Sequence, residues 1–183
     1  MLIELNIAIW LLPIIFMLHD FEEIIMIRAW KQRNHFNDII VEGKNDFLST
    51  KTPYSDMKST ASLSIGVAVE FLLFSLASLV SIISGFYHIW FACMFGLTVH
   101  YIIHLKMCIG FKGYVPGITT SVFCFPASVV LLIYVARVAS FSVLSILVSG
   151  LAGILLLFIL VRVLHRLMGC FIGLLDKYKV NKN

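Results

Sequence analysis

The stretch IAIWLLPIIFMLHDFEEIIMI, residues 7 to 27, decides the fold, because it is long and apolar yet carries ionisable side chains near its end. About 20 residues of helix rise about 30 Å, which is the thickness of the hydrocarbon core of a membrane. The ionisable side chains within the stretch are His19, Asp20, Glu22 and Glu23. The stretch therefore predicts a membrane-spanning helix whose polar residues have a function.

The rest of the chain is equally apolar. Of its 183 residues, 60% are hydrophobic and 13% are charged, against about 25% charged in soluble proteins. Segments long enough to cross a membrane lie near residues 3–27, 61–84, 87–109, 118–139 and 142–161. Because none of them alternates as a barrel strand does, we expect an all-α polytopic membrane protein, one domain over residues 1–183 that bundles five transmembrane helices.

The basic residues predict the orientation of the chain in a cell membrane. If the chain crosses the membrane five times, all of its 14 Lys and Arg residues except Arg137 fall on the same side of the membrane. The positive-inside rule therefore puts the N-terminus outside and the C-terminus in the cytoplasm. Residues 34–59 are expected to form a cytoplasmic loop, and residues 162–179 an amphipathic helix along the inner surface, in contact with membrane lipids. The basic residues are too thinly spread to indicate nucleic acid binding.

The ionisable residues of the first span divide between two directions. On a helix, Glu22 lies about 60° to one side of His19 and Glu23 about 40° to the other, so the three share one face. Asp20 points to the side of that face. We therefore expect His19, Glu22 and Glu23 to face the interior of the bundle.

Two other spans carry polar residues at a similar depth. His100 and His104 are four residues apart in the third span, and so are stacked on one face. The second span carries Glu70, with Gly66 one turn earlier, where a missing side chain would let a helix or a ligand approach closely. Counted from the span ends, these groups fall within one band of the cytoplasmic half of the bundle.

A metal ion would resolve the energetic cost of this band. An ionised acidic residue near the middle of a span costs about 2.5–3.5 kcal/mol, and the only nearby basic residue, Lys106, points the other way. A His and Glu set suits zinc best, with iron or manganese as alternatives. The candidate ligands are His19, Glu22, His100 and His104. His19 and Glu22 are alternatives for one position, and Glu23 or Glu70 would handle protons as the catalytic residue.

Two sequence motifs resemble a known family. HDFEE at 19–23, followed by HYIIHLKMCIGFKGYVPGITTS at 100–121, resembles the HXXEE-domain family of small bacterial membrane proteins over roughly residues 10–130. The resemblance implies a shared architecture and site, but no reaction. It also implies that Asn is common at the position of His100. The family's motif residues in this chain would be His19, Glu22, Glu23, His104, Tyr114, Pro116, Gly117 and Thr120.

The segment from Tyr114 to Thr120 also has a physical interpretation. Pro116 and Gly117 suit a tight turn between the third and fourth spans, and Thr119 or Thr120 can cap the fourth helix. We expect this turn to form the floor of the site and to contact substrate. The N-terminus of the fourth helix could hold an anionic group such as a lipid phosphate.

Three functions fit these features. The leading hypothesis is a membrane-embedded metal-dependent enzyme, a hydrolase or transferase acting on a lipid or lipid-linked substrate. The first alternative is a metal-ion or proton-coupled transporter in which the same His and Glu residues bind the transported ion. The second alternative is a non-enzymatic, partner-binding or immunity-type membrane protein whose polar core is structural.

Overall fold

The computed structural model describes residues 2–34 and 60–180, and within these ranges the chain is helical apart from short turns. The helices are α1 (Leu2–Arg33), α2 (Thr60–Ser84), α3 (His88–Phe111), α4 (Ile118–Val138) and α5 (Val143–Val180). All five are long and apolar enough to cross a membrane. The prediction of an all-α protein with five membrane-spanning helices is therefore confirmed. The loop expected at 34–59 lies outside the described residues, except for Asn34.

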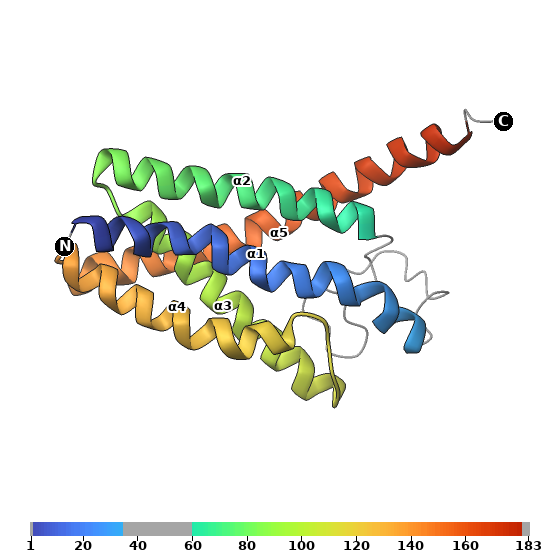
Figure 1. Ribbon diagram of the computed structural model, residues 1–183, viewed down its shortest axis with the longest axis horizontal. Coiled ribbons are helices and arrows are strands. Elements are labelled where there is room, and N and C mark those ends of the chain that lie inside the picture. The colour runs from blue at the N-terminus through green and yellow to red at the C-terminus, as the bar shows by residue number, and fades with distance from the viewer. Residues whose placement is uncertain (1, 35–59, 181–183) are drawn as a thin grey trace.

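The bundle is arranged around α3, which packs against all four other helices and most extensively against α4 and α5. Figure 1 shows α1 lying between α2 and α4, each of which it contacts. The start of α1 and the end of α5 lie at opposite ends of the bundle, as an odd number of crossings requires (Figure 1). Which end faces the cytoplasm stays a prediction.

Small residues let α3 and α5 approach closely. A Cβ atom added at Gly153 would overlap the carbonyl oxygen of Ala92, and one at Gly96 would lie 2.7 Å from the carbonyl oxygen of Gly153. Such contacts drive helix association in lipid, where apolar burial alone gives little. Gly66 in α2 likewise admits the Met168 side chain of α5, whose sulfur would be 3.3 Å from an added Cβ. The close approach expected at Gly66 is therefore observed.

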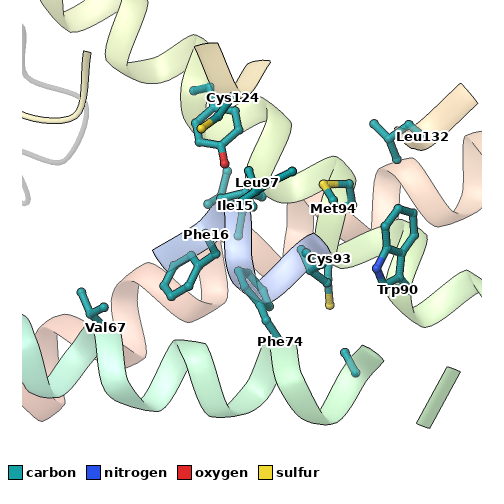
Figure 2. Packing of buried hydrophobic residues seen from close by; sticks show 14 of the residues in the cluster. Ile15, Phe16, Val67, Phe74, Trp90, Cys93, Met94, Leu97, Cys124 and Leu132 are labelled. Carbon is teal, nitrogen blue, oxygen red and sulfur yellow. The ribbon is translucent and has the colours of Figure 1, made fainter. Parts of the chain in front are cut away.

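A proline in α1 ties that helix to two others. Pro13 has no N–H group, so the carbonyl oxygen of Ile9 loses its usual partner within the helix. Trp90 of α3 donates its indole N–H to that oxygen at 2.8 Å, and Ser78 of α2 donates its hydroxyl at 3.0 Å. Nearby, the rings of Phe16 and Phe74 pack edge to face, as Figure 2 shows among the apolar residues of the core. These contacts fix α1 against α2 and α3.

The fifth helix is longer than its predicted span. The expected surface helix at 162–179 is instead continuous with α5, which has 38 residues and is about 57 Å long. The predicted span ended at residue 161 because hydropathy falls at Arg162. No Pro or capping residue interrupts the helix there, so it continues. Its C-terminal part extends beyond the other helices in Figure 1.

Candidate metal centre

Two helices bring four potential metal ligands together. His19 and Glu23 come from α1, and His100 and His104 come from α3, with one ligand atom of each within 4.8 Å of all the others. We call these four residues the ligand group. Their type and number suit a transition metal ion such as zinc.

The distances within the ligand group approach those around a metal ion. His104 Nε2 lies 2.9 Å from both His100 Nε2 and Glu23 Oε1. Glu23 Oε1 is also 3.7 Å from His19 Nε2 and 4.0 Å from His100 Nε2. A tetrahedral zinc ion with nitrogen ligands at about 2.0–2.1 Å holds its ligand atoms about 3.3 Å apart. The observed distances lie on either side of that value, so small side-chain movements would complete the site.

The ligand group is shielded from the surroundings. His19, His104 and Glu23 are buried, and His100 is partly exposed. The ring of His19 packs edge to face against His104, His100 and Tyr101, with centroids 4.7, 5.2 and 4.9 Å away. Packed rings change rotamer at a cost, so the group is preorganised.

The hydrogen bond of His104 leaves its other nitrogen for a cation. His104 Nδ1 lies 3.1 Å from the carbonyl oxygen of Pro116, to which only a protonated nitrogen can donate. In the neutral ring Nε2 then carries a lone pair, which faces the carboxylate oxygen of Glu23 at 2.9 Å. Two acceptors at this distance repel each other unless a proton or a metal ion lies between them. The arrangement therefore fits a bound cation.

His19 is oriented by a chain of hydrogen bonds that ends on Glu22. His19 Nδ1 is 3.0 Å from Thr120 Oγ1, and the Thr120 hydroxyl donates to Glu22 Oε2 at 2.6 Å. His19 Nε2 is fully buried and has no hydrogen-bond partner. Metal-binding histidines commonly donate their second N–H in this way, which fixes the tautomer and the ring direction. The orphaned Nε2 atom of His19 thus supports a fit between the ligand group and a metal ion.

Glu22 lies outside the ligand group, in contrast to the ligand role expected for it. Its carboxylate accepts hydrogen bonds from the Tyr114 hydroxyl at 2.7 Å and from the backbone N–H groups of Thr119 and Thr120 at 3.2 and 2.7 Å. It therefore occupies the N-terminus of α4, where a negative charge is stabilised by the helix dipole. Burial, together with the hydrogen bond to Glu22, raises the pKa of Tyr114 above its ordinary value, so this hydroxyl remains a donor.

The same contacts correct two expectations about α4. Its N-cap is Gly117, which makes no side-chain cap, so neither Thr119 nor Thr120 caps the helix. The anionic group at this N-terminus is Glu22 of α1 rather than an external phosphate. The physical reason is that α1 and α4 pack side by side, which carries a carboxylate to the helix end.

The turn before α4 forms one wall of the ligand group. Gly117 has a φ of +83°, and a Cβ atom added there would lie 2.8 Å from His104 Cε1 and 3.0 Å from Glu23 Oε1. Only glycine fits both the backbone conformation and the space. Trp30 holds the turn in place through a hydrogen bond from its indole N–H to the Tyr114 carbonyl. We call residues 114–120, together with Glu22, the floor.

A cavity of about 100 Å³ opens on the other side of the ligand group, between α1, α2, α3 and α5. Glu23, His100 and His104 line it, as do many apolar side chains of α2 and α5. Glu70 lines this cavity and is not a member of the ligand group.

The cavity is also lined by two polar residues that the sequence analysis did not assign to the site, Asp20 and His165. Asp20, expected to point aside, is 5% exposed. A signal for His165 was present in the sequence, since it shares one helical face with the buried Leu164 and Met168 of α5.

Comparisons with known proteins show the family. A family model described as a protein of unknown function with an HXXEE motif matches residues 10–131. This range contains the whole ligand group and the whole floor. No curated protein and no solved structure matches the chain. Because the match covers most of the chain, the protein belongs to the HXXEE family.

Proposed function

We propose that this protein is a membrane-embedded metal-dependent enzyme in which His19, His100 and His104 hold a zinc ion. The observation that carries the proposal is that three imidazole Nε2 atoms lie 2.9–4.0 Å from one oxygen of Glu23. Three histidine ligands are typical of catalytic zinc sites, in which water or substrate takes the fourth position. Glu23, the fourth member of the ligand group, would then stand beside the ion rather than bind it. Iron and manganese are the competing ions, and the nitrogen-rich set favours zinc.

Glu23 is the best candidate for the proton-transferring residue. When bound, the metal ion would act as a Lewis acid that activates water or polarises a carbonyl or phosphoryl oxygen. Glu23 Oε1 lies beside all three imidazoles, and Glu23 also lines the cavity, so its carboxylate can accept a proton there. Glu70 is a second carboxyl group on the same cavity.

The cavity supports a lipid or lipid-linked substrate for a hydrolase or transferase reaction. Its walls from α2 and α5 are formed mainly by Leu, Val, Met and Phe residues, whereas the ligand group lies on α1 and α3. An apolar chain can occupy the walls while a polar linkage contacts the ligand group. Access from within a bilayer would let such a substrate arrive without leaving the membrane.

Metal content and lipid turnover test the proposal together. The purified full chain should contain about one equivalent of zinc. In vesicles made from a total lipid extract, mass spectrometry should show conversion of a lipid species by wild type. Glu23→Gln should retain zinc and lose conversion, because it keeps the shape of the side chain and removes the base. A wild-type protein with less than about 0.2 equivalents of any transition metal would refute the proposal.

A transporter for metal ions or protons is the second candidate, favoured by the carboxyl groups of Asp20, Glu23 and Glu70 around the cavity. Intramembrane carboxyl groups often mark ion pathways. Liposomes that hold the protein and either a metal-sensitive or a pH-sensitive dye distinguish the two functions. Zinc or proton flux above that of protein-free liposomes would favour the transporter, and its absence would leave the enzyme.

A further inference from the structure

We propose that the cavity binds a second cation, an oxygen-preferring divalent ion such as Mn²⁺ or Mg²⁺, held by the carboxylates of Asp20 and Glu70. The inference deepens the proposed function and rests on it for the ion at the imidazoles. The two sites would differ in chemistry, since one is rich in nitrogen and the other is formed by two carboxylates.

The geometry of α1 separates the two sites. Relative to His19, Glu23 lies about 40° and Asp20 about 100° around the helix, so Glu23 stands between the other two. His19 faces the other imidazoles, whereas Asp20 lines the cavity, as does Glu70 of α2. The cavity thus has carboxyl groups on two helices, next to the ligand group.

Asp20 and Glu70 have no neutralising partner among the described residues. Asp20 is 5% exposed and lines the cavity, and neither carboxyl group forms a hydrogen bond or an ion pair within residues 2–34 and 60–180. No Lys or Arg of the described chain lines the cavity. A buried carboxylate in this position needs a cation or a proton.

Charge balance leaves room for a second divalent ion. One zinc ion at the imidazoles carries two positive charges, while Asp20, Glu23 and Glu70 carry three negative charges when ionised. A second divalent ion outweighs this excess and provides a positive site for an anionic substrate group, such as a lipid phosphate. The described cavity has no Lys or Arg for that purpose.

The size of the cavity fits such an ion. Mg²⁺ and Mn²⁺ are bound through one or two carboxylates and keep several water ligands. Asp20 and Glu70 therefore need not approach each other as closely as the imidazoles do. A space of about 100 Å³ accommodates the ion with some of its water.

A Mn²⁺ titration of the purified, zinc-loaded full chain tests the proposal, with free Mn²⁺ measured by electron paramagnetic resonance. Wild type should bind one Mn²⁺ per chain beyond its zinc. A change to a residue that only supports a ligand lowers metal affinity about 10–100-fold. Asp20→Asn and Glu70→Gln should each weaken Mn²⁺ binding by more than this, with zinc content unchanged. Glu4→Gln, at an acidic residue in the first turn of α1, is the matched control and should leave both ions bound.

Zinc-loaded wild type that binds no Mn²⁺ would overturn the proposal, because protons would then neutralise the carboxyl groups. Equal Mn²⁺ binding in wild type and both variants would also overturn it, as would strong nitrogen coupling in the Mn²⁺ spectrum. The wild-type titration decides the matter even if a variant fails to fold. Mn²⁺ binding that depends on Asp20 and Glu70 in a protein that takes up no zinc would support this inference and refute the zinc enzyme alone.

Discussion

The two sides of the ligand group are built differently. On the floor side, Glu22 and the turn before α4 hold His19 and His104 through hydrogen bonds between 2.6 and 3.2 Å. On the cavity side, mainly apolar side chains of α2 and α5 surround an open space. The floor therefore positions the ligands, while the cavity leaves room for whatever reacts or binds there. Changes to the floor should lower the metal affinity of the ligand group, and changes to the apolar cavity walls should not.

Loss of a ligand held by the floor should have the largest effect. His104→Ala removes the imidazole that contacts both His100 and Glu23. Changing a residue that only supports a ligand lowers metal affinity by up to about 100-fold, and the loss of this ligand should lower it further. Metal content after dialysis against a weak chelator measures this loss. His88→Ala, at the far end of α3, should retain full metal content. Equal content in wild type and His104→Ala would exclude the ligand group as the metal site.

Gly117→Ala should be the next most damaging change. The new Cβ would lie 2.8 Å from His104 Cε1, and a φ of +83° is itself strained for alanine. The strain costs about 1–3 kcal/mol, and displacement of His104 should lower metal affinity as well. Thermal unfolding in detergent and metal titration measure the two effects separately.

Two other glycines separate backbone strain from crowding at the site. Gly85→Ala has a similar φ of +69° with nothing near its Cβ, so it should lose some stability and keep its metal affinity. Gly66→Ala meets only the flexible Met168 side chain on the cavity side and should keep both. If all three variants bind metal equally, the floor does not position His104.

Much of this difference between the two sides follows from the sequence, but not all of it. Hydropathy predicted the five spans, and helical spacing brought His19, Glu23, His100 and His104 to the interior. Spacing could not separate Glu22 from Glu23, since they flank His19 at similar angles. The packing of α4 against one side of α1 and α3 against the other decides which carboxylate becomes a helix cap.

The cavity side was less predictable for a related reason. Asp20 lies to the side of the α1 face that carries His19. It faces inward only because α2 packs against that side of α1. His165 lines the cavity because α5 continues as a helix past Arg162, where falling hydropathy suggested a change of direction. Helices that are distant in the sequence determine both outcomes, and the periodicity of one sequence does not show which helices pack together.

Thr120→Val should produce a moderate loss confined to metal binding. Valine keeps the size of the side chain but removes the hydroxyl that joins His19 Nδ1 to Glu22 Oε2, so metal affinity should fall about 10–100-fold. Thr119→Val is the matched control, because Thr119 contacts Glu22 through its backbone N–H only. Isothermal titration with zinc measures both variants. Similar affinities in the two would mean that the orientation of His19 does not depend on Glu22.

Tyr114→Phe should have the smallest effect, and its pH dependence identifies the cause. The lost hydrogen bond to Glu22 is charge-assisted, but Tyr114 is 38% exposed, so the loss of stability should be about 1 kcal/mol. Because burial and the Glu22 carboxylate raise the pKa of Tyr114 in the folded protein, its contribution is complete below the unfolded value of about 10. It declines as the pH rises from there through the folded pKa. Unfolding of wild type and Tyr114→Phe should therefore differ by a constant amount from pH 7 to 9 and converge above pH 10. A difference that instead changes between pH 7 and 9 would mean that another group, not the Tyr114 hydroxyl, links the turn to Glu22.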